Sequence, residues 1–374
     1  MIAPGATIGI LGGGQLGQMT ALAAASLGYK VHVYCPDPDG PAKLVTPFAT
    51  TATYEDRAAL ERFAAAVDVV TFEFENVPAE AADHLARLKP VRPSPAVLKI
   101  SQDRLREKDF LRSIDVATTD YRDVGDPAAL ARAVRDLGLP SVLKTVRYGY
   151  DGKGQVKIAT DGDIEAGWAE MGAPQGILER FVDFDCEISV IVARTPSGAC
   201  TTYVPVENQH AHHILDTTIA PARIPPAVAM RAEAMARHIA EKIDLVGLLA
   251  VEMFVTPADQ ILVNELAPRP HNSYHESELA CVTNQFEQGI RAVCDLPLGS
   301  TAIMRPAAIH NLLGDVWRRG RAPDFAKALS VSGVTLRLYG KGDPRPGRKM
   351  GHLTASAETP ELAVERVREA YAAL

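Results

Sequence analysis

The sequence predicts a mixed α/β and α+β protein built from three domains. Near the N-terminus, short apolar runs alternate with helical runs, which is typical of a parallel sheet covered by helices on both faces. Residues 141–192 carry short β-rich runs and glycine turns with one clear helix at 164–171, which indicates a small α+β lobe. The remainder combines a long helix at 225–243 with apolar runs at 248–255 and 261–266. We therefore expect an N-terminal α/β domain over 1–115, a central α+β lobe over 116–183 and a C-terminal mixed α+β domain over 184–374.

The elements of the N-terminal domain follow in order from its pattern. Residues 7–11, 30–34 and 69–74 are apolar runs that we interpret as strands. Helices are expected at 15–27, near 56–66 and from about residue 78. Ser94 is placed to cap the helix that follows the proline-punctuated loop KPVRPSPAV. A charged helix over 101–114 would form the exit from this domain.

Composition narrows the class of protein. A chain of 374 residues with 47% apolar content can bury a substantial core. A formal net charge of -7 argues against nonspecific binding to nucleic acid, which needs a basic surface. No run reaches the roughly 20 apolar residues of a membrane span, and the first residues lack the basic region of a signal peptide. The scattered cysteines form no CxxC pair. We expect a cytoplasmic protein that binds neither nucleic acid nor membranes.

A glycine turn, GGGQLG at residues 12–17, follows the first strand and opens the first helix. It satisfies G-x-G-x-x-G, and Asp37 lies about where a dinucleotide-binding fold places its ribose-binding acid. The motif alone leaves three interpretations: an NAD-dependent oxidoreductase, a purely structural turn, or a cradle for the phosphate of another substrate. We favour the last, because free N–H groups at a helix N-terminus attract any phosphate.

Two glutamates in the segment VEMFVTPADQILVNELAP give the strongest local signal. If residues 257–260 form the turn between two strands, Glu252 and Glu265 lie directly opposite each other on one face. Like charges in that position are destabilising, and a divalent cation between them would remove the cost. Oxygen ligands suit Mg²⁺, especially when nucleotide phosphates complete its shell. The alternative is a register that differs by one and turns these side chains to solvent.

A lysine and a glycine loop point to a nucleotide. Lys144 lies in the apolar strand SVLKT and can either pair with nucleotide phosphates or extend to solvent. The following YGYDGKGQ can close over phosphates or form a plain hairpin turn. Further along, ILERFV resembles a strand that leads to a hinge, with Glu179 placed to accept hydrogen bonds from ribose hydroxyls. Together with the paired glutamates, these features favour nucleotide binding.

The combined motifs resemble the ATP-grasp superfamily and, within it, the N5-carboxyaminoimidazole ribonucleotide synthetases of purine biosynthesis. The resemblance runs from GGGQLGQM through GYDGKGQ and VNELAPRPHNS to RPGRKMGHL, and so covers nearly the whole chain. It implies an ATP-grasp fold with a pre-ATP-grasp domain, a lid domain and a catalytic domain. It also implies a carbon–nitrogen ligase that uses ATP, Mg²⁺, bicarbonate and 5-aminoimidazole ribonucleotide and releases ADP and phosphate by way of carboxyphosphate.

The resemblance assigns the nucleotide and metal residues by position. Glu252 and Glu265 would hold Mg²⁺. The residues that would contact ATP are Arg104, Lys144, Gly149, Tyr150, Asp151, Gly152, Lys153, Gly154, Gln155, Glu179, Arg180, Phe181, Val182, Glu187, His210, Asn264 and Glu265. For His210 an alternative stays open, because the neighbouring His212 and His213 could shift the alignment.

The resemblance also assigns the carboxylation and substrate residues. Arg269, His271, Asn272 and Lys341 would be catalytic, with Arg269 and His271 at the bicarbonate site, where donors face developing negative charge. The residues that would hold the ribonucleotide are Gln15 and Leu16 at its phosphate, Glu73 at its ribose, Tyr150 and Asp151 at its base, and Lys341, Arg348 and Lys349 as a phosphate clamp. Simpler interpretations remain: a solvated basic turn at Arg348 and Lys349, a His271 that only orders its loop, and a salt-bridged Glu73. Tyr274 departs from the family pattern, since relatives usually have glycine there, and it could alter the mouth of the site.

Other inferences complete the hypothesis. The resemblance implies a homodimer whose product passes to a mutase. The nearest alternative activity is the formate-dependent glycinamide ribonucleotide transformylase of the same superfamily, whose relatives carry Asp where this chain has Asn272. An NAD-dependent oxidoreductase is the alternative from a different class.

Overall fold

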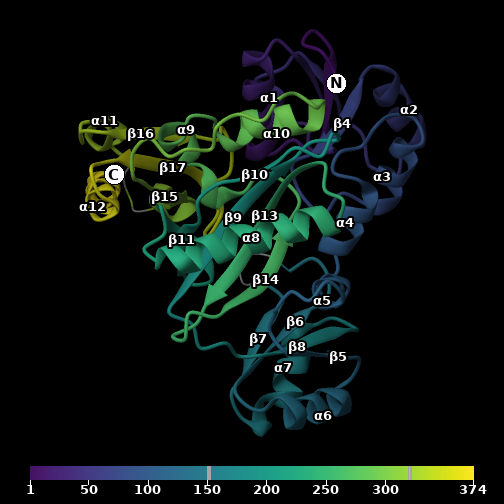
Figure 1. The fold of residues 1–374 in the computed structure, drawn as a ribbon, viewed down its shortest axis with the longest axis vertical. Helices are drawn as coiled ribbons and strands as arrows, with labels where there is room; N and C mark the ends of the chain where they lie inside the picture. Colours follow the sequence, from purple (N-terminus) through teal and green to yellow (C-terminus); the bar gives the residue numbers. More distant parts are fainter. Residues whose placement is uncertain (150–152, 319, 321) are drawn as a thin grey trace.

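The computed structural model describes residues 1–149, 153–318, 320 and 322–374, and its strands form three separate sheets (Figure 1). The sheets occupy successive parts of the chain. Residues 7–72 form the first, residues 121–180 the second and residues 186–356 the third. The three parts meet around a common centre, which is where the candidate site lies (Figure 1).

The first sheet is parallel, in the order β3-β2-β1-β4. Its strands are β1 (Thr7–Leu11), β2 (Lys30–Tyr34), β3 (Phe48–Thr50) and β4 (Val69–Phe72), and the associated helices are η1 (Pro41–Leu44), α1 (Gln15–Ser26), α2 (Arg57–Ala65), α3 (Ala79–Ala86) and α4 (Pro95–Ser101). Strands β1 and β4 are almost wholly buried because helices cover both faces, which explains why they are continuous apolar runs. The prediction of a parallel sheet is confirmed. Ser94 caps α4 by accepting a hydrogen bond from the Val97 N–H.

The predicted start of the charged helix at 101–114 is wrong. Helix α4 ends at Ser101, and α5 (Arg104–Ser113) is a separate helix that begins at Arg104. Asp103 has an extended backbone, and its side chain accepts a hydrogen bond from the Arg106 N–H. An aspartate in that role caps a new helix, and this competes with continuation of the old one.

The second sheet is antiparallel and forms the lobe at the bottom of Figure 1, in the order β5-β8-β6-β7. Its elements are β5 (Tyr121–Val124), α6 (Pro127–Leu137), β6 (Ser141–Thr145), β7 (Gln155–Ile158), η2 (Asp161–Asp163), α7 (Ile164–Met171) and β8 (Gly176–Arg180). Helix α7 has the predicted bounds. Within residues 141–192 it is the one α-helix among the described residues, as predicted; α6 lies before that segment and buries Leu130, Val134 and Leu137 against the sheet.

The third sheet has nine strands, and each strand pairing in it is antiparallel. The strands are β9 (Cys186–Arg194), β10 (Cys200–Thr202), β11 (Val206–Ala211), β12 (Ile214–Ala220), β13 (Gly247–Val255), β14 (Ile261–Ala267), β15 (Ala307–Leu313), β16 (Val334–Leu338) and β17 (Lys349–Ser356). The helical segments are α8 (Pro226–Lys242), η3 (Asn272–Tyr274), α9 (Ser277–Ala280), α10 (Gln285–Cys294), η4 (Gly314–Arg318), α11 (Phe325–Leu329) and α12 (Pro360–Ala373).

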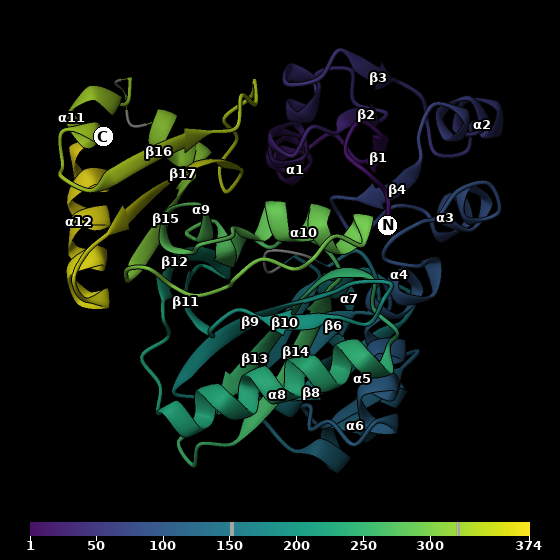
Figure 2. The ribbon, with the colours of Figure 1, turned by 45° about the horizontal axis from the view of Figure 1, so that its top comes forward.

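Two helices fix how this sheet sits. Helix α8 packs along one face and shares the largest core with β9, β13 and β14. Helix α10 lies between the third sheet and the N-terminal domain, where it packs on β9 and β13 on one side and on α1 on the other (Figure 2). The hairpin β13–β14 and the start of α1 are therefore held against a common support.

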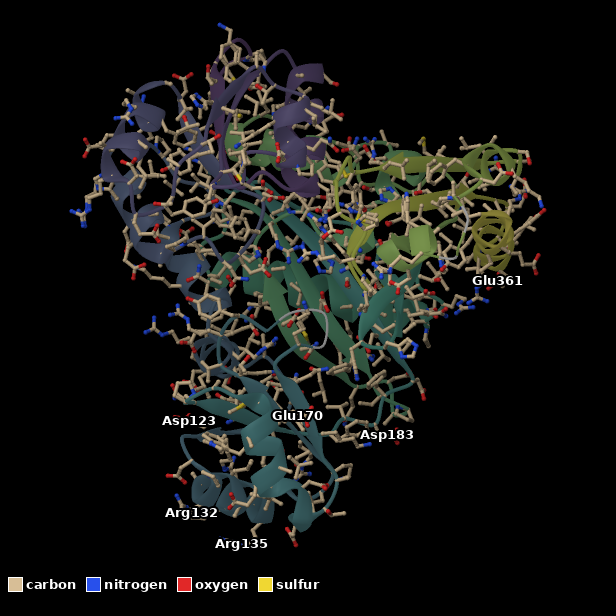
Figure 3. All side chains as sticks on the ribbon, turned by 180° about the vertical axis from the view of Figure 1, so that it is seen from behind. Asp123, Arg132, Arg135, Glu170, Asp183 and Glu361 are labelled. Carbon is tan, nitrogen blue, oxygen red and sulfur yellow. The ribbon has the colours of Figure 1, made fainter. Side chains whose placement is uncertain are left out.

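Exposed charged side chains cover the lobe (Figure 3). Arg132 and Arg135 on α6 lie at its far end, and Asp123 on β5 and Glu170 on α7 lie nearer the rest of the molecule. Both signs thus occur on the surface of the lobe. In the described part of the chain, no helix combines the length and the apolar character needed to cross a bilayer.

Candidate active site

A cavity of about 810 Å³ opens where the three parts of the molecule meet. It brings together most of the residues that the sequence analysis assigned: Gln15, Leu16, Glu73, Arg104, Lys144, Gly149, Lys153, Gln155, Glu179, Arg180, Phe181, Val182, Glu187, His210, Glu252, Asn264, Glu265, Arg269, His271, Asn272 and Lys349. Gly154, Lys341 and Arg348 do not line it. Tyr150, Asp151 and Gly152 lie outside the described residues.

Glu252 and Glu265 are directly paired across the β13–β14 hairpin, as the sequence predicted. The route to this register differs from the prediction. Val255 pairs with Ile261, so the loop spans residues 256–260 and is one residue longer than expected. A β-bulge between the Met253–Val263 pair and the Glu252–Glu265 pair then inserts Asn264 into β14. The bulge compensates for the longer loop, and both carboxylates line the cavity.

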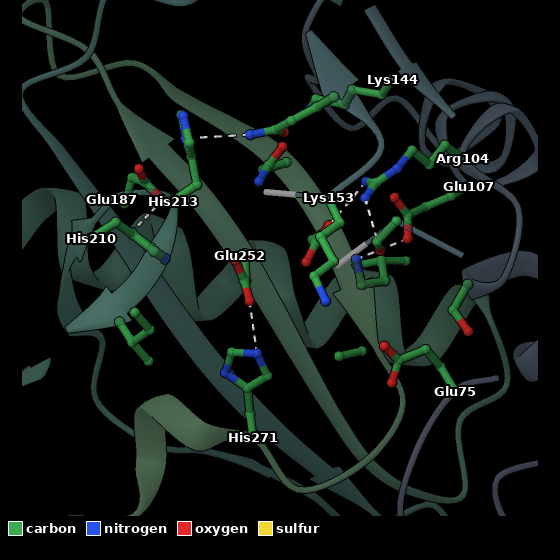
Figure 4. Close-up of a pocket in the computed structure, with 18 of the residues that line it drawn as sticks. Glu75, Arg104, Glu107, Lys144, Lys153, Glu187, His210, His213, Glu252 and His271 are labelled. Carbon is green, nitrogen blue, oxygen red and sulfur yellow. Dashed lines mark hydrogen bonds and ion pairs between the residues drawn. The ribbon is translucent and has the colours of Figure 1, made fainter. Parts of the chain in front are cut away.

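Each of the paired glutamates also faces a basic side chain. The carboxylate of Glu252 lies 2.7 Å from the Nε2 atom of His271 (Figure 4). The carboxylate of Glu265 accepts a hydrogen bond of 3.0 Å from Arg104. Burial would raise the pKa of Glu252, but His271 outweighs this and holds the pKa at about 2.

A third carboxylate, Glu187 on β9, shows how much negative charge gathers here. Its side chain lies 3.3 Å from the Nδ1 atom of His210 (Figure 4). Burial, followed by the nearby charges of Glu252 and Glu265, raises the pKa of Glu187 to about 7. The raised pKa shows that Glu252 and Glu265 place an excess of negative charge beside Glu187, and a bound cation would neutralise that charge.

The donor set fits Mg²⁺ that shares its ligands with a nucleotide. Glu252 and Glu265 supply hard oxygen atoms, and the buried Oδ1 atom of Asn264 beside them has no hydrogen-bond partner among the described residues. Within the described residues, no group of three or more His, Cys, Asp or Glu side chains forms a complete metal cage. Mg²⁺ usually takes one or two carboxylates and completes its shell with phosphates and water, so two glutamates suffice.

Lys144 is held by Glu179 rather than extended to solvent. Its Nζ atom donates to the Glu179 carboxylate at 2.7 Å, and both side chains are buried. Burial would raise the pKa of Glu179, but Lys108 and then Lys144 hold it at about 2. The Oε2 atom of Glu179 thus carries Lys144, whereas its buried Oε1 atom has no hydrogen-bond partner among the described residues and lies 3.6 Å from the Lys108 Nζ atom. The expected bond to a ribose remains a prediction.

The neighbouring residues Glu107 and Lys108 on α5 were not foreseen from the sequence. Both are buried, at 2% and 0% exposure. Burial and then the charge of Glu265 raise the pKa of Glu107 to about 8. The Nζ atom of Lys108 lies 3.6 Å from the Glu179 carboxylate. In the sequence, Glu107 and Lys108 can be recognised only by their position on the helix face that also carries Leu111. Because most residues of this helix are charged, that face is easily interpreted as exposed to solvent.

The glycine turn meets Glu73 at the start of α1. The Glu73 carboxylate accepts hydrogen bonds from the N–H groups of Gly14 at 2.7 Å and Gly17 at 3.0 Å. A Cβ atom at Gly14 would lie 2.7 Å from this carboxylate, so the close approach requires glycine there. Burial raises the pKa of Glu73, opposed by these two N–H groups. Gln15 and Leu16 line the cavity beside it, which leaves this helix end open to an anion.

The loop after β14 holds the remaining polar groups. The Nε atom of Arg269 donates to the carboxylate of Glu75, a residue that the sequence analysis did not assign. His271 is fixed by Ser273 Oγ at 2.7 Å from its Nδ1 atom, which leaves Nε2 directed at Glu252. Asn272 donates to the side chain of Asn311 at 3.1 Å. These bonds give the loop one defined arrangement facing the cavity.

The predicted phosphate clamp is only partly assembled at the cavity. Lys349 lines it, and the Nζ atom of Lys341 donates to the Lys349 carbonyl at 2.7 Å. Arg348 lies in the adjoining turn, and its guanidinium donates to the Asp343 carbonyl at 2.8 Å. A phosphate at Lys349 would therefore have these other two basic residues close by in the chain.

Tyr274 does not disturb the mouth of the site. Its ring is buried in an apolar core with Tyr203, and its hydroxyl donates to the carbonyls of Ser189 and Val204, both at 2.8 Å. The side chain thus points away from the cavity, and the residue is not among those that line it. The apolar wall of the cavity comes instead from Phe184 and Phe254, whose rings stack at 4.8 Å between centroids.

The fold and the site together define an ATP-grasp protein, an ATP-dependent ligase with a nucleotide cavity between two antiparallel sheets. Residues 109–286 match the model of the ATP-grasp domain. Residues 5–102 match the ribonucleotide synthetase preATP-grasp domain, and residues 307–366 match the phosphoribosylaminoimidazole carboxylase C-terminal domain. The NAD-dependent and formate-dependent alternatives are not favoured.

Relatives and solved structures narrow the class to one family. The chain is 44% identical to the N5-carboxyaminoimidazole ribonucleotide synthase of Brucella melitensis biotype 1, over 94% of this chain and 96% of the relative. It is 43% identical to that of Bacillus subtilis strain 168, over 98% and 96%. It is also 43% identical to the bifunctional purine synthesis protein purC/E of Dictyostelium discoideum, of which it spans only 37%. The chain belongs to the N5-carboxyaminoimidazole ribonucleotide synthase family.

Solved structures of the family superpose on the whole chain. An ADP complex of an N5-carboxyaminoimidazole ribonucleotide synthetase has a TM-score of 0.94 at 40% identity, over 99% of this chain and 97% of that one. The Aspergillus clavatus enzyme in complex with ADP and 5-aminoimidazole ribonucleotide has a TM-score of 0.91 at 31% identity, over 99% and 98%. The predicted ATP-grasp fold is confirmed.

Proposed function

We propose that this protein carboxylates 5-aminoimidazole ribonucleotide at the expense of ATP and bicarbonate, as a ligase of purine biosynthesis. The observation that carries the proposal is the direct pairing of Glu252 with Glu265 in a cavity that also holds Lys144 and Arg269. The names of the relatives and the Aspergillus complex with ADP and the ribonucleotide support the choice of substrates.

The reaction consists of two transfers that balance. An oxygen of bicarbonate attacks the γ-phosphorus of ATP, ADP leaves, and carboxyphosphate forms. The exocyclic amine of the ribonucleotide then attacks the carboxyl carbon, phosphate leaves, and the amine gives up a proton. Mg²⁺ held by Glu252 and Glu265 would offset the charge of the transferred phosphoryl group.

The roles of the residues follow from their contacts. Lys144 is held by the Glu179 carboxylate and lines the cavity, where its Nζ atom can pair with nucleotide phosphates. Arg269, oriented by Glu75, donates hydrogen bonds to bicarbonate and to the charge that develops on it. His271 Nε2, now on Glu252, can do the same once the metal takes that carboxylate.

The ribonucleotide takes the side of the cavity formed by the N-terminal domain and β17. Its phosphate binds at the Gln15 and Leu16 N–H groups with Lys349, supported by Lys341 and Arg348, and Glu73 faces its ribose. The assignments of Tyr150 and Asp151 to its base remain predictions. We also propose domain boundaries near residues 115 and 183, a homodimer, a cytoplasmic location and transfer of the product to a mutase.

Phosphate release tests the function directly. The protein is incubated with Mg²⁺ and ATP, and phosphate is measured with each of bicarbonate and 5-aminoimidazole ribonucleotide present or omitted. Release that requires the ribonucleotide and rises with bicarbonate supports the proposal. Formate with glycinamide ribonucleotide serves as the matched alternative, and turnover with that pair alone would refute it.

A further inference from the structure

The position of Glu265 depends on the bulge in β14. On the hairpin side of the bulge, Met253 pairs with Val263. Continued without interruption, that register would set Glu252 opposite Asn264 and would move Glu265 to the other face of the sheet, because side chains alternate along a strand. The one extra residue is what places the two carboxylates on one face.

The backbone of this bulge is bonded to residues outside the sheet. Strand β14 is an edge strand of its sheet, and outside the sheet its backbone meets residues 117–118 in an isolated parallel bridge. The Val263 N–H donates to the Ala117 carbonyl at 2.9 Å. The Asn264 carbonyl accepts a hydrogen bond of 3.0 Å from the Nζ atom of Lys108. The Val263 carbonyl accepts one of 2.7 Å from Thr118 Oγ1, and Lys108 lies 3.4 Å from the same carbonyl. Lys108 and Thr118 are also bonded to each other at 2.9 Å.

The far side of the bulge is held from the same helix. Glu107, the residue before Lys108, accepts a hydrogen bond of 2.9 Å from the Leu266 N–H. Two adjacent side chains of α5 thus bond the backbone on both sides of Glu265. Lys108 is wholly buried and does not line the cavity, so it reaches the site only through the groups it bonds.

We propose that Lys108 is a positioning residue that, with Thr118, holds the β14 bulge and thereby keeps Glu265 opposite Glu252 for the metal. The proposal rests on the metal site of the proposed function. Lys108 also approaches the carboxylate of Glu179, which carries Lys144, so the same amino group connects the metal hairpin to the phosphate-binding lysine.

Metal binding, measured apart from turnover, tests this role. Mn²⁺ is titrated into the protein saturated with a non-hydrolysable ATP analogue, and binding is followed by water proton relaxation. Lys108→Met keeps the apolar stem and removes the donor, and Thr118→Val removes one bond with little change of shape. Thr118→Ser keeps the hydroxyl. Leu111→Ala, on the same helix and equally buried, destabilises the packing of α5 while leaving the side-chain hydrogen bonds to the bulge in place.

The expected pattern separates positioning from general destabilisation. Loss of hydrogen bonds to the bulge should weaken Mn²⁺ binding about tenfold or more in Lys108→Met and about threefold in Thr118→Val. Thr118→Ser and Leu111→Ala should stay within about twofold. In steady-state assays, Lys108→Met should raise the KM for Mg²⁺ more than it lowers kcat at saturating metal.

Two outcomes would overturn the proposal. One is a folded Lys108→Met that binds Mn²⁺ like the wild type, or, if that variant does not fold, a Thr118→Val that does so. The other is a Leu111→Ala variant that loses as much metal affinity as they do. Glu265→Gln serves as the reference: if it binds Mn²⁺ like the wild type, the metal site itself is misplaced and the proposed function fails first.

Discussion

Glu75 and Arg269 form an ion pair that joins the N-terminal domain to the loop after β14, and both line the cavity. Burial would raise the pKa of Glu75, but the Arg269 guanidinium outweighs it and holds the pKa at about 2. The residue proposed to bind bicarbonate is therefore aimed by a carboxylate from a different domain.

Glu75→Gln should weaken bicarbonate use selectively. The amide can still accept a hydrogen bond but no longer balances the charge of Arg269, so the guanidinium loses its fixed orientation. We expect the KM for bicarbonate to rise about tenfold, with the KM for ATP nearly unchanged. The exposed Glu80→Gln is the matched control. Equal effects on both Michaelis constants would count against the aiming role of Glu75.

Glu265→Gln should abolish ATP hydrolysis while the fold survives. The change removes one metal ligand and leaves Arg104 with a neutral partner, but it also relieves repulsion from Glu252 and Glu187. We expect phosphate release to fall more than about a hundredfold, with circular dichroism unchanged. Glu170→Gln, at an exposed residue of α7 in the lobe, is the control. Ordinary turnover in Glu265→Gln at normal Mg²⁺ would rule out the metal assignment.

Arg348→Ala should raise the apparent KM for the ribonucleotide about tenfold and change that for ATP little. The guanidinium now bonds the Asp343 carbonyl and would have to turn toward the phosphate when substrate binds. Arg345→Ala in the same turn, whose side chain pairs with Asp343, is the comparison. If Arg348→Ala instead raises the KM for ATP alone, the phosphate clamp is misplaced.

His352 should make stability depend on pH below neutrality. Burial lowers its pKa from 6.5 to about 3, so between these values the unfolded chain binds a proton that the folded chain does not. Stability therefore rises with pH through this window and is lost as pH falls below about 6.5. Urea unfolding between pH 4.5 and 6 should show a slope smaller by about 1 kcal/mol per pH unit in His352→Gln than in the wild type. Identical slopes would contradict a neutral buried imidazole.

Tyr274→Phe should reduce stability and leave catalysis alone. The change removes the one hydroxyl proton that the carbonyls of Ser189 and Val204 share. We expect the free energy of unfolding to fall by about 1–3 kcal/mol, since the carbonyls lose a buried donor. All Michaelis constants should stay within about twofold of the wild type, because the side chain points away from the cavity. A large kinetic effect would show that the loop geometry depends on this hydroxyl.

The sequence was most informative where a local pattern has one physical solution. Two apolar runs on either side of a short turn sequence indicated that Glu252 faces Glu265, and this is correct although the turn was misplaced. The loop is one residue longer than expected, and the bulge at Asn264 restores the register. The bulge itself could not be read, because it is stabilised by Lys108 and Thr118, which are distant in sequence.

The residues that were missed act through contacts distant in sequence. Glu107 and Lys108 look like part of a solvated helix until β14 is packed over them. In the sequence, Glu75 is an acidic residue shortly after a strand, and its partner Arg269 lies 194 residues further along the chain. The Glu73 carboxylate was expected at a ribose, and its bonds to Gly14 and Gly17 follow from the tertiary approach of β4 to α1.

Helix α10 supports two parts of the molecule at once, since α1 packs on one of its sides and β9 and β13 pack on the other. Helix α10 packs closely on β13 at Gly289, because a Cβ atom there would lie 3.0 Å from the Leu248 side chain. The helix proposed to bind the ribonucleotide phosphate and the strand that carries Glu252 thus both pack against α10. A substitution that tilts α10 would therefore shift α1 and β13 together, so the geometry of the ribonucleotide side and that of the metal side of the cavity cannot change independently at this helix.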